Sequence, residues 1–144
     1  MPAPATTGRG LYTLVGLTTA IGGYLADWNH THVFNDRWPP HAKFHNGQTM
    51  SMGLCLGLST LYYVWRRNPN ITAEKDALRI STWLASMYWI TQMSAILYPG
   101  SRAMDPEFGD GFPQAYLCAG LGLIIWGGYY LESGRIMEME KRKA

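Results

Sequence analysis

Charged side chains are missing from four long stretches of this sequence. Only 15% of its 144 residues are Asp, Glu, Lys or Arg, against about 25% in a typical soluble domain. The uncharged stretches cover residues 10–26, 46–65, 80–101 and 112–131. An α-helix needs roughly 20 residues to cross about 30 Å of hydrocarbon, so each stretch is long enough to do so. We therefore expect an all-α, polytopic membrane protein whose four transmembrane helices form a bundle.

The expected helices form a single four-helix transmembrane domain over residues 1–144. They cover about residues 10–28, 41–66, 77–99 and 112–134. The alternative is a soluble four-helix bundle, which a mean hydropathy of −0.12 favours. Each helix of such a bundle normally carries a charged stripe, and the four stretches have none. Their many Gly, Ser and Thr residues, including the pair Gly53 and Gly57, suit close contacts between helices.

Basic residues predict an orientation for this bundle. Nine of the twelve Lys and Arg residues lie with the two termini and the middle loop. Because basic loops stay on the cytoplasmic side of a membrane, both termini are expected in the cytoplasm. The loop after the first helix then faces the lumenal or external side.

Other absences exclude several classes of chemistry. The two cysteines, Cys55 and Cys118, fall inside expected helices and are read as packing residues rather than a disulfide. No phosphate-binding glycine loop and no Ser or Cys nucleophile motif is present. A net charge of +2 without a basic cluster gives no nucleic-acid footprint. The chemistry must therefore come from another residue type.

Histidine is confined to one short region. All four histidines lie within sixteen residues, at positions 30, 32, 41 and 45. Histidine titrates near neutral pH and is the commonest metal ligand, so this grouping predicts a site. His41 and His45 are four residues apart in an expected helix and share one face. They are the first candidate catalytic residues.

Further residues complete the predicted site. Two carboxylates near the same expected boundary, Asp27 and Glu107, join the catalytic set. The residues predicted to bind substrate are Trp38, Gln48, Met52, Tyr88 and Gln92. Gln48 and Met52 extend the histidine face along the helix, whereas Tyr88 belongs to an aromatic and methionine-rich part of the third helix.

A short motif resembles a known family. The residues His41-x3-His45-Asn46-Gly47, preceded by Trp38, resemble the His-x3-Glu-Gly pattern of the emopamil-binding sterol isomerases in the EXPERA group. That resemblance implies a small four-helix protein of the endoplasmic reticulum with cytoplasmic termini and a lumenal histidine loop. It also implies acid/base isomerisation or cyclisation of an apolar lipid, terpenoid or sterol-like substrate. His45 stands where the family has glutamate, so a histidine pair would have to move the proton.

Two alternatives remain open from the residues alone. In the first, His30, His32, His41 and His45 bind zinc, copper or iron, together with Asp27, whereas the acid/base reading needs no cofactor. In the second, the protein is non-catalytic and binds a sterol or lipid, or is an accessory subunit of a membrane complex. The partners expected under these readings are an apolar small molecule or lipid, the membrane and a second copy in a homo-oligomer.

Overall fold

Local sequence signals mark where each helix begins in the computed structural model, which describes residues 3–143. The side chain of Thr6 caps the first helix, α1 (Thr7–Asp27), and Asn70 caps α3 (Ile71–Ser94) in the same way. Proline occupies the first turn of α2 (Pro40–Trp65) and of α4 (Pro113–Lys141), where its missing N–H is not needed. Two short 3-10 helices, η1 (Ala95–Leu97) and η2 (Pro106–Phe108), lie between α3 and α4. The expected all-α, four-helix architecture is confirmed.

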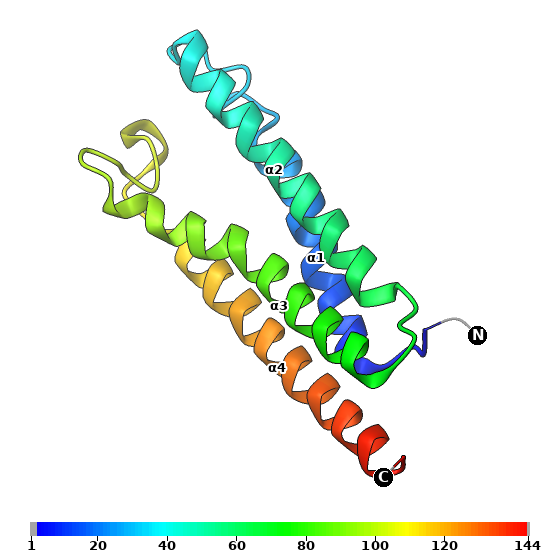
Figure 1. Ribbon diagram of the computed structural model, residues 1–144. Helices are drawn as coiled ribbons and strands as arrows, with labels where there is room; N and C mark the ends of the chain where they lie inside the picture. The colour runs from blue at the N-terminus through cyan, green and yellow to red at the C-terminus, as the bar shows by residue number, and fades with distance from the viewer. Residues whose placement is uncertain (1–2, 144) are drawn as a thin grey trace.

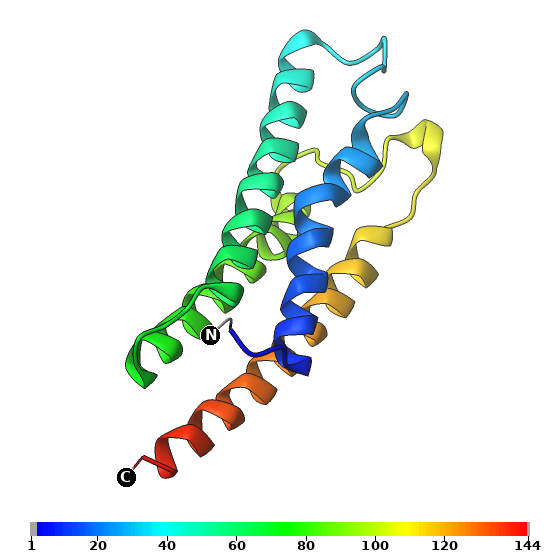
Figure 2. The ribbon, with the colours of Figure 1, turned by 90° about the vertical axis from the view of Figure 1, so that its right-hand side faces the viewer.

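The helices form two antiparallel pairs. Figure 1 shows the α1–α2 pair beside the α3–α4 pair, and the two pairs diverge along their length. Across the pairs, α1 packs on α4 and α2 packs on α3. Both termini lie at the close end, which we call the terminal end (Figures 1 and 2). The connections 28–39 and 95–112 lie at the divergent end, which we call the loop end.

Small residues allow the closest helix contact. A Cβ atom placed on Gly57 of α2 would lie 2.6 Å from the backbone nitrogen of Ala20 and would also overlap the carbonyl oxygen of Gly16 in α1. Gly53 is similarly placed, 2.8 Å from the carbonyl oxygen of Thr19. The two glycines therefore serve packing of α2 on α1, because only hydrogen fits there.

Buried hydroxyl groups are satisfied within their own helices. Thr19, Thr60 and Ser81 each donate to the carbonyl oxygen four residues earlier, at distances of 2.9, 2.9 and 2.7 Å. This pattern lets a polar residue lie in a helix contact without an unpaired donor. It explains how uncharged stretches rich in Ser and Thr can form a core.

The expectation of membrane-spanning helices is wrong. Among residues 3–143, no helix combines the length and the apolar character that crossing a bilayer requires. The sequence reading took absence of charge as a sign of apolarity, but the same stretches are rich in Gly, Ser and Thr. In addition, α3 begins six residues earlier than expected and so includes the charged residues at positions 74–76. Three predictions depended on these spans and are therefore also wrong: the polytopic architecture, the topology and the integral-membrane localisation in the endoplasmic reticulum.

Candidate functional site

The divergence of the helix pairs leaves a cleft at the loop end. Its floor is closed by Trp89 of α3, whose indole N–H donates to the hydroxyl of Thr19 in α1 at 3.1 Å. Above this floor the cleft has a volume of about 490 Å³. All four helices and the 28–39 connection contribute to its lining: Gly23, Ala26, Asp27, His32, Trp38, Ala42, His45, Asn46, Thr49, Tyr88, Trp89, Gln92, Gln114, Leu117 and Cys118.

Aromatic rings form much of the cleft wall. Tyr88 and Trp89 are adjacent on α3, and their rings pack edge to face with centroids 5.1 Å apart. Trp38 lines the cleft from the 28–39 connection, held edge-on against the His32 ring at 4.8 Å. Rings of this size present flat apolar surfaces with polar edges, which suits contact with an apolar molecule.

The carboxylate of Asp27 is the charged group of the cleft. Asp27 is the last residue of α1, and its Oδ2 accepts a 2.8 Å hydrogen bond from Nδ2 of Asn46 in α2. His32 places Nδ1 3.7 Å from the other carboxylate oxygen, Oδ1. Within residues 3–143, no lysine or arginine lines this cleft. The cleft therefore presents a carboxylate without a lysine or arginine side chain in its described lining.

Burial changes the acid–base properties of two lining residues. Desolvation raises the pKa of the Tyr88 hydroxyl, and the negative charge of Asp27 adds to that effect. Desolvation also raises the pKa of the Cys118 thiol. Both groups consequently stay protonated at neutral pH, so Tyr88 presents a hydroxyl rather than a phenolate.

A second chamber opens above the cleft. It has a volume of about 420 Å³ and shares Ala26, Asp27, His32, Trp38 and Gln114 with the cleft. Its cover is the connection between α3 and α4, including Arg102, Met104 and Phe108. This connection is fixed in place at two points: Trp38 Nε1 donates to Asp105 Oδ2 at 3.1 Å, and Gln114 Nε2 donates to the carbonyl oxygen of Ala103 at 2.8 Å.

Two buried amide oxygens in the cleft lack hydrogen-bond donors. They are Oδ1 of Asn46 and Oε1 of Gln114, and neither accepts a hydrogen bond from the described part of the chain. In both side chains the amide nitrogen is already engaged, with Asp27 and Ala103 respectively. An unpaired buried acceptor is unfavourable, and native proteins contain few of them.

The structure brings together five of the nine predicted catalytic and substrate-binding residues. Asp27, His45, Trp38, Tyr88 and Gln92 all line the cleft. The other four are His41, Gln48, Met52 and Glu107, and none of them lines it. Gln48 and Met52 are exposed on α2, whereas Glu107 forms an ion pair with Arg37 over the loop end.

The histidines divide into separate groups. His45 Nε2 lies 3.0 Å from His41 Nε2, but His41 is exposed outside the cleft. His32 faces Asp27, whereas His30 packs near Phe34 with ring centroids 6.0 Å apart. No group of three or more His, Cys, Asp or Glu side chains within residues 3–143 has a metal-binding arrangement. The four histidines therefore do not fit a shared zinc, copper or iron site.

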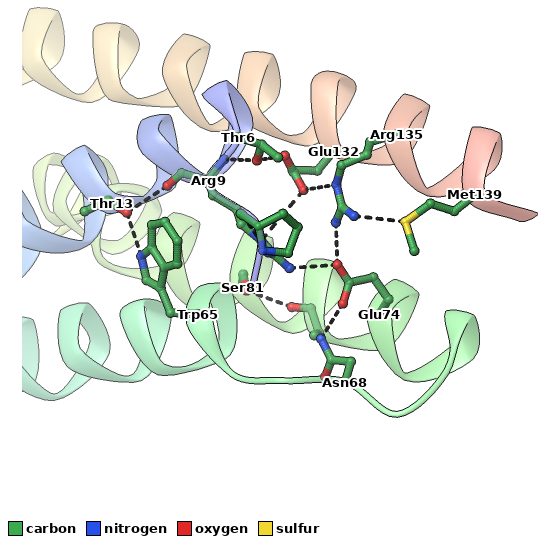
Figure 3. Close-up of polar contacts among 12 residues, drawn as sticks. Thr6, Arg9, Thr13, Trp65, Asn68, Glu74, Ser81, Glu132, Arg135 and Met139 are labelled. Atoms are coloured by element: carbon green, nitrogen blue, oxygen red, sulfur yellow. Dashed lines mark hydrogen bonds and ion pairs between the residues drawn. The ribbon is translucent and has the colours of Figure 1, made fainter. Parts of the chain in front are cut away.

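Sequence reasoning missed a buried polar cluster at the terminal end (Figure 3). We call Thr6, Arg9, Asn68, Glu74, Glu132 and Arg135 the ion cluster. Arg9 Nη2 lies 2.7 Å from Glu74 Oε1, and Arg135 Nε lies 2.8 Å from Glu132 Oε2. Arg135 also pairs with Glu74. The three-residue spacing of Glu132 and Arg135 was the available signal, but Arg135 was counted only among the basic residues that predicted the orientation.

Every carboxylate of the ion cluster has partners. Glu132 accepts from Thr6 and Arg135, and Glu74 accepts from Arg9, Arg135 and Asn68. Burial acts to raise the pKa of the Glu74 carboxyl, but the hydrogen bonds from Asn68 and Arg135 and the charge of Arg9 outweigh it and lower that pKa. The space enclosed here is only about 20 Å³, roughly that needed by one water molecule.

Comparison with known proteins gives one match. A family described as "Family of unknown function (DUF6640)" matches residues 12–143. No curated protein and no solved structure matches this chain. The matched region includes the whole cleft and most of the ion cluster. It supplies no activity, and the isomerase or cyclase assignment is not carried forward, because no comparison supports it and His41 lies outside the cleft.

Proposed function

The chain belongs to the DUF6640 family of unknown function, and we propose that it is a small-molecule-binding protein whose ligand occupies the cleft at the loop end. The observation that carries this proposal is the cleft itself, an open space of about 490 Å³ lined by residues of all four helices, among them three large aromatic side chains. Ligand sites in proteins are typically concave, largely apolar, and about 300–1,000 Å³ in volume.

The lining of the cleft suits a ligand with an apolar body. Trp38 and Tyr88 offer ring surfaces, and Leu117 and Ala42 add aliphatic surface from α4 and α2. Because most of the exposed surface of the lining is apolar, the polar groups would orient the ligand rather than supply most of the binding free energy. The binding free energy then comes mainly from removing apolar surface from water.

The construction of the bundle supports the same conclusion. Helix packing is close at the terminal end, where Gly57 lies against α1 and the ion cluster is closed. At the loop end the pairs diverge, and two hydrogen bonds hold the α3–α4 connection over the opening. A chain that packs this tightly in one half leaves space in the other half for a second molecule.

Filling the cleft tests the proposal. Ala42 lines the cleft from α2, and Ala42→Phe would place a ring in the space assigned to ligand. The fluorescent probe 2-(1-naphthyl)ethanol has an apolar body and a single hydroxyl, and its binding is measured by fluorescence titration. We expect saturable binding to the wild-type protein and at least about a tenfold loss of affinity in Ala42→Phe, because the two rings compete for one volume.

A matched control separates a local effect from a general one. Ala119 is exposed on α4 and does not line the cleft, so Ala119→Phe adds the same ring elsewhere. We expect it to bind the probe as the wild-type protein does. Absence of saturable binding to the wild-type protein, or equal affinities of Ala42→Phe and Ala119→Phe, would refute a ligand site in the cleft.

A further inference from the structure

The two unpaired amide oxygens of the cleft define the polar chemistry of its ligand. Oδ1 of Asn46 and Oε1 of Gln114 are both buried, both lie on residues that line the cleft, and Asn46 is only 8% exposed. Each has the capacity to accept a hydrogen bond that the described residues do not use. This inference rests on the proposed function and specifies what the ligand must carry.

The orientation of each amide is fixed by its other partner. Rotating the Asn46 amide by 180° would direct its oxygen at the Asp27 carboxylate, which also accepts and carries negative charge. Rotating the Gln114 amide would direct its oxygen at the carbonyl oxygen of Ala103. In both rotated forms the amide oxygen would face another hydrogen-bond acceptor, which is unfavourable. The amide nitrogens therefore donate to Asp27 and Ala103, and the two amide oxygens are left without a donor among the described residues.

The rest of the polar lining adds to this preference. Asp27 contributes a carboxylate, whose Oδ1 lies 3.7 Å from Nδ1 of His32. In the described chain no lysine or arginine side chain lines the cleft to receive an anion. Negative potential and free acceptors together favour ligands that donate hydrogen bonds and disfavour carboxylates and phosphates.

We propose that the ligand is an alcohol or an amine with an apolar body, held by donation from its O–H or N–H groups to Asn46 Oδ1 and Gln114 Oε1. A hydroxyl supplies one donor and therefore pairs one of the two free oxygens, whereas an ammonium group supplies three donors and can pair both. An ether, a carboxylate or a phosphate ester supplies no donor and leaves both oxygens buried and unpaired.

Four probes with the same naphthalene body test this proposal. They are 2-(1-naphthyl)ethanol, 2-(1-naphthyl)ethylamine, the methyl ether of the alcohol, and 1-naphthylacetate, each titrated against the wild-type protein. We expect the alcohol, the amine or both to bind at least about tenfold more tightly than the ether and the acetate, since an unpaired buried acceptor is strongly unfavourable. The tighter of the two donors identifies the ligand chemistry, and equal binding of all four probes would overturn the proposal.

A conservative variant assigns the effect to one oxygen. Gln114→Met keeps the length of the side chain and removes the amide, so the preference for alcohol over ether should fall severalfold. Binding of the ether measures how the substitution changes the cleft apart from hydrogen-bond donation, so the alcohol-to-ether ratio isolates the contribution of the oxygen. An unchanged alcohol-to-ether ratio in Gln114→Met and in Asn46→Leu would overturn the assignment. If the four probes bind equally and Ala42→Phe still prevents binding, the cleft is a ligand site without donor selectivity, whereas absence of all binding refutes the proposed function itself.

Discussion

The two ends of the bundle differ in whether their buried polar groups have partners. At the terminal end, Arg9 and Glu132 are about 95% buried, yet each has opposite-charge partners and encloses almost no free space. At the loop end, Asn46 is nearly as inaccessible, but its oxygen is unpaired and the residue lines a cleft of about 490 Å³. Complete pairing marks the terminal end as structural, and incomplete pairing beside open volume marks the loop end as a site for ligand.

This comparison also explains which end holds the helices together. The ion cluster joins α1, α3 and α4 and the short connection before α3, so it fixes the relative positions of both helix pairs (Figure 3). The loop end has few such ties, mainly those of Trp38 and Gln114. Substitutions at the terminal end should therefore affect stability most, and those at the loop end should affect binding most.

The largest expected effect is at Glu132. Glu132→Ala leaves Arg9 and Arg135 with fewer partners in a buried environment, and removal of one member of a buried ion pair typically costs about 3–5 kcal/mol. Urea unfolding should show a loss of that order. Glu138→Ala is the control, because its pair with Arg142 is exposed and should matter far less. Equal losses for the two variants would mean that the ion cluster is not structural.

The contact of α1 with α2 gives the next effect. Gly57→Ala places a Cβ against backbone atoms of Gly16 and Ala20, which cannot move independently of α1. Overpacking of this kind should destabilise the protein by about 1–3 kcal/mol. Gly47→Ala on the same helix meets no atom within 4 Å and should instead stabilise it by about 0.5–1 kcal/mol. If Gly57→Ala and Gly47→Ala changed the unfolding free energy in the same direction, the close contact of Gly57 with α1 would be contradicted.

Acid should weaken the terminal end selectively. The pKa of Glu74 is lowered from its ordinary value of 4.5, so its contribution to stability is complete above that pH and is lost as the pH falls toward the folded-state pKa. Glu74→Gln cannot titrate at this position. The unfolding free energies of wild type and variant should therefore converge as the pH falls from 6 to 3. A constant difference over that range would show that Glu74 is not held in its charged form by the cluster.

The smallest stability effect should come from the cleft. Gln114→Met loses the hydrogen bond to Ala103 and also removes a buried unpaired oxygen, and these changes oppose one another. We expect Gln114→Met to change the free energy of unfolding, measured by thermal and urea unfolding, by less than about 1 kcal/mol. A loss as large as that of Glu132→Ala would show that the loop end is as structural as the terminal end.

The sequence predicted the helices better than their surroundings. The uncharged stretches were enough to indicate four helices, although the third was expected to begin at residue 77 rather than at Ile71. Absence of charge did not distinguish a membrane span from a helix whose Ser and Thr hydroxyls bond to its own backbone, as in Thr60 and Ser81. That distinction depends on hydropathy of the whole helix rather than on charge.

The candidate site was predicted in part. The histidine region and Asp27 pointed to the end of the bundle where the cleft lies, and Tyr88, Gln92 and Trp38 line that cleft. Helical spacing placed His41 and His45 on one face, but it could not show that the cleft begins at His45 and leaves His41 outside. Asn46 and Gln114 were missed because an unpaired oxygen is visible only when the partner of the amide nitrogen is known. The acid/base role of His41, His45 and Glu107 stays a prediction.

A crystal structure of the protein with 2-(1-naphthyl)ethanol tests the central claim most directly. The account predicts that the naphthalene lies against Trp38 and Trp89 in the cleft, that the hydroxyl donates to Asn46 Oδ1 or Gln114 Oε1, and that the ion cluster is unchanged. A probe bound elsewhere, or a cleft filled by the protein's own side chains with both amide oxygens paired, would contradict it.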